Sequence, residues 1–346
     1  MYKWVCLLLW VSTNCCTAQE GKSSYAMRTI AFYNVENLFD TTNDSLIYDD
    51  DRTPDGKDEW TIRRYLTKVN YIAKVLSQIG PKEKITTPDI IGVCEIENSE
   101  VLRAILLDSA LVSKNYSFIH SNSPDRRGID VALLYKKDAF IPVAFQSRRL
   151  VLQDENEVRK YTRDQLVVSG FLDGEAFSFI VNHWPSRSGG EAKSRRYRIA
   201  AAKLNKRIID SLVGVNPNAK IISMGDFNDD PIDHSFRKIL RTNSNKDSLS
   251  SYHLHNPMEM LFKKGIGSLA YRDEWNLFDQ FFFTTNLLNV PNNGHQFWKA
   301  GVFAPSFLKI QKGKYKGYPF RTYAGGVYTG GYSDHFPVYM CLLQKH

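Results

Sequence analysis

QLVVSGFLDGEAFSFIVNH, residues 165–183, is the stretch of sequence that decides the class of fold. Two apolar runs, 165–172 and 176–182, are joined by Asp173 and Gly174. A two-residue Asp-Gly connection between such runs is typical of a β-hairpin. Because the hairpin is antiparallel, the sheet that contains it cannot be wholly parallel.

Helical patterns alternate with short apolar runs on both sides of this hairpin. Over 62–79 the apolar residues recur at helical spacing, with Thr61 placed to cap the helix N-terminus. Further helices are expected over 101–111 and 195–212. Further strands are expected at 29–35, 89–96, 116–120, 129–135, 220–224, 280–284 and 337–343. The pattern predicts an α/β fold, a four-layer α/β/β/α sandwich of two packed mixed sheets flanked by helices, in a single domain over 29–346.

The N-terminal segment has the pattern of a secretory signal. Lys3 precedes an apolar run over 5–11, and small residues end at Ala18. The run is far shorter than the roughly 18 apolar residues that span a bilayer, so no transmembrane segment is expected. We expect residues 1–18 to be a signal peptide, 19–28 to be a short N-terminal segment, and the protein to be exported, periplasmic or secreted.

The cysteines offer one alternative for the N-terminus and little chemistry elsewhere. A lipoprotein signal ending at Cys15 or Cys16 is less favoured, because the preceding Ser-Thr-Asn is a poor approach to a lipidated cysteine. After signal removal only Cys94 and Cys341 remain, both in apolar strand-like runs. They are expected to be core thiols, and no cysteine or histidine spacing is typical of a zinc site.

The net charge of the chain is +8, which favours anionic partners. Nucleic acid, phospholipid headgroups and phosphorylated small molecules all fit this charge, and charge alone does not choose among them. No stable protein partner is predicted.

Polar residues interrupt the apolar runs where the predicted strands end or begin. Because such positions can meet at one rim of a sheet, they are candidates for a site on rigid elements. The residues are Asn34, Glu95, His183, Asp226, Asn228, Asp279, Asp334 and His335.

Hard oxygen ligands are prominent in this set. Glu95, Asp334 and the amide of Asn34 suit Mg²⁺, with Mn²⁺ as the alternative. Asp279 could hold the His335 imidazole in the tautomer that accepts a proton from water. A metal-assisted reaction at a phosphate is the chemistry that these residue types favour.

Seven segments in a fixed order resemble the motif series of the endonuclease/exonuclease/phosphatase superfamily. The resemblance runs from about residue 29 to the C-terminus and suggests an exported, bacterial-type member. The segments are YNVENLF (33–39), CEIEN (94–98), RRGIDVALLY (126–135), NHWPSR (182–187), GDFND (225–229), LFDQFF (277–282) and SDHFPV (333–338).

The resemblance implies a Mg²⁺-dependent hydrolase that cleaves P–O bonds of phosphate esters by attack of an activated water. Glu95 resembles the principal metal ligand of the family, with Asn34 and Asp334 assisting. Whether one or two metals act is left open.

The resemblance also implies catalytic roles. His335 paired with Asp279 resembles the water-activating dyad, and His183 occupies a phosphate-binding position. Asp226 and Asn228 would position the nucleophile or protonate the leaving group. Whether His335 or Asp226 takes the proton is left open.

Two arginines are expected to bind substrate phosphate. Arg187 lies a few residues after His183, and Arg127 lies in the RRGID segment. For the other cations of 193–198, a solvated start of the following helix is the expectation.

The substrate is argued from the loop over 312–332, which mixes cations with aromatics. Cations beside exposed aromatics can follow a phosphate backbone while bases stack; the alternative is that the tyrosines simply pack on the domain. A nuclease-type phosphodiesterase acting on nucleic acid is therefore the first expectation. A phosphatase or phosphodiesterase for lipid headgroups, inositol phosphates or nucleotides is the second, and a non-catalytic phosphate-binding module is the third. The residues concerned are Lys314, Lys316 and Arg321 with Tyr315, Tyr318, Phe320, Tyr323, Tyr328 and Tyr332.

Overall fold

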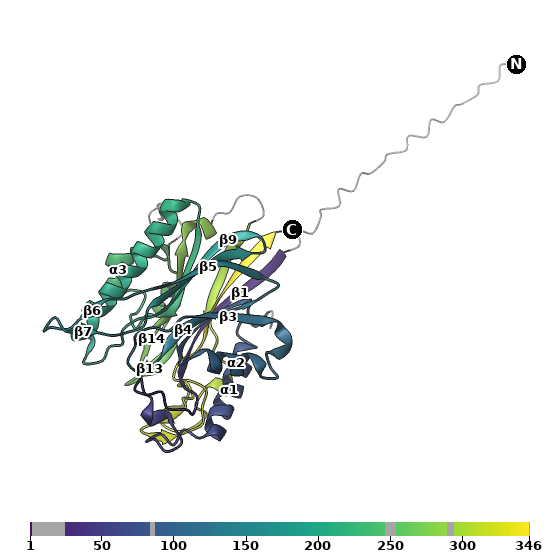
Figure 1. Cartoon of the computed structure of the whole chain (residues 1–346). Helices are drawn as coiled ribbons and strands as arrows, with labels where there is room; N and C mark the ends of the chain where they lie inside the picture. The colour runs from purple at the N-terminus through teal and green to yellow at the C-terminus, as the bar shows by residue number, and fades with distance from the viewer. Residues whose placement is uncertain (2–24, 84–86, 246–253, 289–293, 346) are drawn as a thin grey trace.

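The computed structural model describes Met1 and residues 25–83, 87–245, 254–288 and 294–345 (Figure 1). Two large sheets pack face to face between helices. Apart from Met1, the predicted signal peptide and the cysteines of the lipoprotein alternative lie outside the described residues. Within the described part of the chain, no helix is both long and apolar enough to cross a membrane.

The first sheet has six strands in the order β16-β19-β1-β2-β4-β3. β1 pairs in parallel with β2 and antiparallel to β19, so the sheet is mixed. The strands are β1 (Tyr25–Leu38), β2 (Ile90–Ile96), β3 (Tyr116–His120), β4 (Asp130–Lys136), β16 (Gln296–Val302) and β19 (Val338–Lys345).

The second sheet has seven strands in the order β11-β12-β15-β10-β9-β8-β5. β8 and β9 form the predicted hairpin, and both Asp173 (φ 49°) and Gly174 (φ 81°) adopt the left-handed backbone that a tight turn of this kind requires. The strands are β5 (Phe140–Arg148), β8 (Gln165–Leu172), β9 (Glu175–His183), β10 (Lys220–Asp226), β11 (Thr242–Asn243), β12 (Leu254–His255) and β15 (Asp279–Thr284).

Three small hairpins and several helices complete the fold. The hairpins are β6–β7 (Leu152–Gln153 and Arg159–Lys160), β13–β14 (Leu269–Tyr271 and Glu274–Asn276) and β17–β18 (Tyr323–Ala324 and Val327–Tyr328). The α-helices are α1 (Ile62–Leu76), α2 (Ser99–Leu107), α3 (Glu191–Val215) and α4 (Met258–Lys263). Short 3-10 turns lie at η1 (Asp50–Arg52), η2 (Val112–Lys114), η5 (Thr285–Leu287) and η6 (Ser306–Leu308), and η3 (Ser235–Leu240) is a π-helix of six residues.

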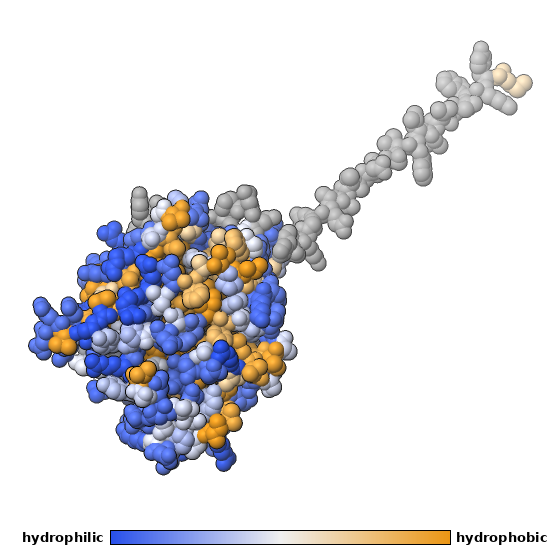
Figure 2. Space-filling model, in the orientation of Figure 1, coloured by the Kyte–Doolittle hydropathy of each residue, from blue (hydrophilic) through white to orange (hydrophobic). Residues whose placement is uncertain are grey.

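Three buried clusters of apolar side chains hold the layers together. One lies between the sheets, where Phe32 and Cys94 share a cluster with Phe179 and Met224. A second packs α1 and α2 on the outer face of the first sheet, and a third packs α3 on the outer face of the second. The fold is thus the predicted four-layer sandwich. On the face drawn in Figure 2 most residues are polar and apolar ones form small scattered groups, as expected when the apolar faces are buried.

Helix boundaries follow local capping. The Thr61 side chain accepts a hydrogen bond from Arg64 N at 3.4 Å, as predicted for the start of α1. α2 begins two residues before the predicted Val101 because the Asn98 side chain accepts from the amides of Glu100 and Val101. β5 was not predicted, since most of its side chains are exposed and its burial does not alternate.

Two cysteines and two histidines outside the candidate site residues have defined surroundings. Cys94 and Cys341 are buried free thiols, as expected. His120 lies 3.0 Å from Asp130, and His295 contacts Asp173 and Glu175 at the β8–β9 hairpin. These partners lie on neighbouring strands or a turn, where short motifs do not reveal them.

Candidate active site

The strand-end residues of both sheets meet at one rim of the sandwich. Asn34 and Glu95 come from the parallel pair β1 and β2, and His183 and Asp226 from the parallel pair β9 and β10. The two pairs touch across the sheets: Asn34 Nδ2 lies 3.1 Å from Asp226 Oδ2, and His183 Nε2 lies 3.7 Å from Glu95 Oε1. The geometry therefore joins residues that the sequence places far apart.

His335 and Asp279 lie at the same rim, at the starts of strands that run antiparallel to β1 and β10. Asp279 begins β15, and His335 comes just before β19. His335 Nδ1 lies 2.6 Å from Asp279 Oδ2, and its Nε2 faces Asp226 Oδ2 at 3.9 Å and Asp334 Oδ1 at 4.0 Å. Burial alone would lower the pKa of His335, but Asp279, Asp226 and Asp334 outweigh it and hold that pKa well above its ordinary value. The pairing at Nδ1 leaves Nε2 as the ring atom that faces the site.

Glu95 is fixed by an irregular backbone. Its φ is 63°, and the residue lies where the pairing of β2 with β1 and β4 shifts in register. Asn37 N donates to Glu95 Oε2 at 2.8 Å. A left-handed conformation at a residue other than glycine is uncommon and costs energy, and such strain gathers at functional sites. Asn228 has the same feature, with a φ of 51°.

Gly225 brings β9 and β10 close together beside the site. A Cβ atom at this position would stand 2.4 Å from the carbonyl oxygen of Asn182, which is an overlap with backbone. Only glycine therefore fits immediately before Asp226.

The Asn34 amide has a defined orientation. Its Nδ2 donates to Asp226 Oδ2 and faces Glu95 Oε1 at 3.4 Å, while its Oδ1 accepts from Glu36 N at 2.9 Å. In this orientation the amide holds two carboxylates together. Direct metal ligation by Asn34 would use Oδ1, so its role as a ligand stays a prediction.

The carboxylates of the rim form an environment that fits a divalent cation. Burial, with added repulsion from Asp279 and Glu95, raises the pKa of Asp226 to about 7, although His335 opposes the shift. Burial and Glu36 raise the pKa of Asp334 to about 6. Clustered carboxylates whose charge is poorly compensated are the oxygen ligands that Mg²⁺ and Mn²⁺ prefer.

Among the described residues, one buried group also has the spacing to hold a metal ion by its side chains alone. The ligand atoms of Asp226, Asp279 and His335 lie within 4.8 Å of one another, and Asp279 Oδ1 is buried without a hydrogen-bond partner. The predicted ligands Glu95 and Asp334 border this group. The rim therefore fits a metal, and the exact ligand set stays a prediction.

His183 is 4% exposed, and its buried Nδ1 has no hydrogen-bond partner among the described residues. Burial, together with the positive charges of Arg163 and Arg127, holds the pKa of His183 well below its ordinary value. The ring is therefore neutral, and one of its nitrogens can donate to a phosphate oxygen while carrying no charge.

The Asn228 side chain points away from solvent and donates to the carbonyl oxygen of Trp184 at 3.0 Å. Arg163 Nη2 donates to the same oxygen at 2.7 Å. Asn228 N donates to Asp226 Oδ1 at 3.0 Å, so the loop after β10 holds the Asp226 carboxylate. In this conformation Asn228 orders the site, and its expected part in positioning the nucleophile or protonating the leaving group stays a prediction.

Arg187 and Arg127 both lie beside the site, in different settings. Arg187 donates to Asn228 O and to Asp233 Oδ2, so its guanidinium also braces the loop after β10. Arg127 is half exposed and lies 3.4 Å from Asp125. Arg127 is thus the more available of the two, and phosphate binding by either stays a prediction. Arg198, expected among solvated cations, is instead fully buried in an ion pair with Asp229.

A charged network near Asp334 has members that the sequence reading missed. The Glu36 carboxylate accepts from Thr322 N at 2.6 Å and lies 3.4 Å from Arg321 Nε and 3.8 Å from Lys68 Nζ. Lys68 is buried, and burial lowers its pKa to about 8 despite the nearby Glu36. Glu36 lies inside the YNVENLF segment, which was the available signal. Lys68 lies on the apolar face of α1, where a lysine is unexpected.

Arg321 links this network to the rim, because its Nη2 lies 3.0 Å from Asp334 Oδ2. The loop over 312–332, which is expected to contact nucleic acid, therefore contains one cation, Arg321, that already forms an ion pair with Asp334. Tyr332 of the same loop is buried, whereas Tyr315 is exposed. The alternative, that the tyrosines pack on the domain, holds for Tyr332, and contact of this loop with nucleic acid stays a prediction.

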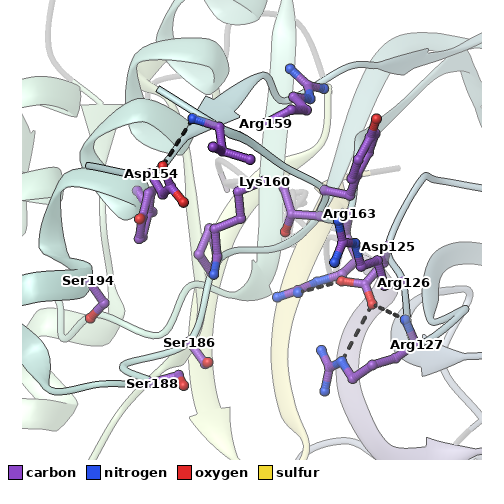
Figure 3. A pocket seen from close by; sticks show the side chains of 15 residues that line it. Asp125, Arg126, Arg127, Asp154, Arg159, Lys160, Arg163, Ser186, Ser188 and Ser194 are labelled. Atoms are coloured by element: carbon purple, nitrogen blue, oxygen red, sulfur yellow. Dashed lines mark hydrogen bonds and ion pairs between the residues drawn. The ribbon is translucent and has the colours of Figure 1, made fainter. Parts of the chain in front are cut away.

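Two cavities open beside the rim. The first, which we call the aromatic cavity, has a volume of about 500 Å³ and includes Tyr271, Tyr315, Tyr318, Lys314, Arg321 and Asp334 in its lining. The second, the arginine cavity, has a volume of about 530 Å³ and includes Arg126, Arg127, Arg159, Lys160 and Arg163 (Figure 3).

Strand order places the catalytic rim between these cavities. In the first sheet, the segments before β19 and before β4 lie on either side of β1 and β2, which carry Asn34 and Glu95. In the second sheet, the segments before β15 and before β8 lie on either side of β10 and β9. The aromatic cavity is built from the segments before β15 and β19, and the arginine cavity from those before β4 and β8.

A sequence model described as the endonuclease/exonuclease/phosphatase family matches residues 29–344. The chain therefore belongs to this family, whose members are phosphoester hydrolases that depend on a divalent metal. None of the curated proteins matched the chain.

Solved structures share the fold at low sequence identity. D. rerio TDP2 complexed with a single-strand DNA product is 13% identical with a TM-score of 0.53, and the alignment covers 92% of this chain and 99% of that one. A Bacteroides thetaiotaomicron mannosyl-6-phosphatase is 18% identical with a TM-score of 0.53, covering 91% and 99%. The human Nocturnin catalytic domain with bound sulfate is 14% identical with a TM-score of 0.53, covering 94% and 98%. Likeness at these identities shows the fold alone.

Proposed function

We propose that the protein is an exported, Mg²⁺-dependent phosphodiesterase that hydrolyses nucleic acid. The family supplies the reaction class, a phosphoester hydrolysis, and the choice of substrate rests on the surroundings of the rim.

The position of the two cavities carries this choice. A phosphodiester has a substituent on each side of the scissile phosphate, whereas a phosphomonoester has one. The aromatic cavity and the arginine cavity flank the rim, so a substrate can extend from the reacting phosphate in both directions. Exposed tyrosines on one flank and arginines on the other are the side chains that bind bases and phosphates.

The histidines and carboxylates of the rim then have roles in hydrolysis. Asp279 fixes the His335 ring through Nδ1, so Nε2 can exchange a proton with water or with an ester oxygen. Asp226, with its pKa raised to about 7 by burial, is the second group able to exchange a proton near neutral pH. His183 is placed to donate to a phosphate oxygen. A divalent cation held by Glu95 and Asp334 would polarise the phosphoryl group and offset its negative charge.

A structural neighbour supports this substrate class. D. rerio TDP2, which shares the fold, is known in complex with a single-strand DNA product, so a protein of this fold can hold nucleic acid. The net charge of +8 also favours a polyanion.

Export is the second part of the proposal and rests on Lys3, the apolar run over 5–11 and Ala18. N-terminal sequencing of protein recovered from its native host tests it. A mature N-terminus near residue 19 in the periplasm or medium is the expected result, and an intact Met1 on cytoplasmic protein would contradict it.

The substrate is tested by incubating the mature chain and Mg²⁺ with supercoiled plasmid, linear DNA, RNA and a phosphomonoester chromogen, each with and without EDTA. We expect Mg²⁺-dependent cleavage of at least one nucleic acid at a higher kcat/KM than the monoester. Efficient release of phosphate from the monoester with intact nucleic acids would favour the phosphatase alternative.

A further inference from the structure

The arginine cavity carries an excess of positive charge that the protein does not neutralise. Five basic residues line it against two acidic ones, Asp125 and Asp154. Asp125 is shared between Arg163 and Arg127, as Figure 3 shows. Asp154 Oδ1 accepts from the backbone amides of Asn156 and Val158, which makes it part of a turn.

The three remaining cations have no acidic partner. Among the described residues, no carboxylate lies within ion-pair distance of Arg126, Arg159 or Lys160. Aromatic rings hold them instead: Arg126 and Arg159 each lie 5.6 Å from the ring centroid of Tyr161, and Lys160 lies 5.3 Å from that of Tyr197. A ring face positions a cation and leaves its charge available to an anion.

A buried donor on the cavity wall also lacks an acceptor. Arg163 is 6% exposed, and its two terminal nitrogens donate to Asp125 Oδ2 and to Trp184 O. Its Nε has no hydrogen-bond partner. This N–H is enclosed by the protein, so Arg163 acts on an anion in the cavity through its positive charge.

One carbonyl group, that of Trp184, links a residue of the cavity wall to a residue of the rim by hydrogen bonds. Trp184 follows His183 in the chain, and its carbonyl oxygen accepts from both Arg163 and Asn228. Pro185 and Ser186, which come next, line the cavity. A ligand group in the cavity would therefore lie beside the phosphate held at His183.

We propose that the arginine cavity is an anion subsite that binds a second phosphate group of the substrate, next to the phosphate that is cleaved. Phosphate is the class of anion that fits, because it offers several acceptor oxygens to guanidinium groups that approach from different walls. This inference rests on the proposed phosphodiesterase function and adds to it a binding site for the neighbouring phosphate of the substrate.

The β6–β7 hairpin supplies the residues that allow a test. It projects beside α3 in Figure 1, and its β7 strand consists of Arg159 and Lys160, which lie away from the buried core. The variant R159S/K160S removes two charges there without disturbing the buried Arg163–Asp125 pair. The matched control K203S/K238S removes two exposed lysines from another cavity, of about 560 Å³, that shares no lining residue with the arginine cavity.

The substrates are the dinucleotide TpT, with one internal phosphate, and its derivatives pTpT and TpTp, each with one further phosphate. The expected result for the parent chain is a KM for pTpT or TpTp lower than that for TpT by about tenfold or more. R159S/K160S should lose this advantage, and K203S/K238S should keep it. The advantage should also weaken with added salt in the parent chain and depend less on salt in R159S/K160S.

Equal KM values for the three dinucleotides, or an advantage that persists in R159S/K160S, would overturn the subsite while leaving the phosphodiesterase function standing. If no dinucleotide is cleaved, the plasmid, linear DNA and RNA assays decide the proposed function, and calorimetry with inorganic pyrophosphate in EDTA decides the subsite by itself. Binding that is weakened about tenfold in R159S/K160S and retained in K203S/K238S supports the anion subsite. Binding that is equal in all three proteins, or absent from the parent chain, overturns it. Matching thermal unfolding curves show that the variants are folded.

Discussion

His335 Nδ1 and Asp279 Oδ2 lie 2.6 Å apart, although 56 positions separate the two residues in the chain. Asp279 begins β15 of the second sheet, and His335 lies just before β19 of the first. The contact therefore joins the two sheets at the rim, so the dyad forms only when the sandwich is assembled.

The first prediction concerns this dyad. His335→Ala and Asp279→Asn should each lower kcat/KM by about 10²–10⁴-fold, because either change disables the same proton-exchanging pair. The double variant should be no worse than the poorer single variant. A double-mutant cycle on kcat/KM measures this, with His234→Ala as a control at an exposed histidine. Multiplied losses in the double variant would mean that the two residues act independently.

The second prediction concerns the metal. Glu95→Gln keeps the shape of the side chain and removes its charge, so it should weaken Mn²⁺ or Mg²⁺ binding and lower kcat by about 10²-fold or more. Calorimetry measures binding and a fixed-time assay measures rate, with the exposed Glu100→Gln as the control. Full activity in EDTA would refute metal dependence.

The third prediction concerns Gly225. In Gly225→Ala the new methyl group would overlap the Asn182 carbonyl, so the free energy of unfolding should fall by about 1–3 kcal/mol and activity should fall with it. The control is Gly214→Ala in α3, where a Cβ meets nothing within 4 Å and stability should not fall. Chemical denaturation of both variants measures the difference. An unchanged free energy of unfolding in Gly225→Ala would show that β9 and β10 can move apart without loss of stability.

The fourth prediction separates cations of the loop over 312–332. Arg321 pairs with Asp334 and Glu36, so Arg321→Ala should lower kcat on every substrate. Within the described part of the chain, Lys314 and Lys316 pair with no carboxylate, so K314S/K316S should raise KM for an oligonucleotide and reduce the salt slope by about 1 to 2. Steady-state kinetics over a salt series measures both, with K203S/K238S as the charge-matched control. An unchanged salt slope in K314S/K316S would remove this loop from the nucleic-acid surface.

Much of the rim could be predicted because its residues sit at strand ends within short motifs. Asp226 follows an apolar run and Asp334 precedes one, and such positions are readable from a single sequence. The Asp173–Gly174 turn was equally readable, because its residue types match the backbone that the turn requires.

Residues that act through distant contacts could not be predicted in this way. Lys68 and Thr322 are 254 positions apart, and Glu36 and Arg321 are 285 apart, so no local pattern links them. The arginine cavity depends on the β6–β7 hairpin, whose strands have two residues each and therefore show no periodicity. Burial of Arg198 was missed for a related reason: its partner Asp229 lies on another element.

A matched pair of chromogens tests the central claim, that the rim cleaves phosphodiesters, most directly. Thymidine 5′-(p-nitrophenyl phosphate) and p-nitrophenyl phosphate share a leaving group and differ in the second ester. With Mg²⁺, the parent chain should show a kcat/KM for the diester at least about tenfold above that for the monoester, since both flanks of the rim can contact the diester. His335→Ala should lower both activities by about 10²–10⁴-fold. A higher kcat/KM for the monoester would contradict the account.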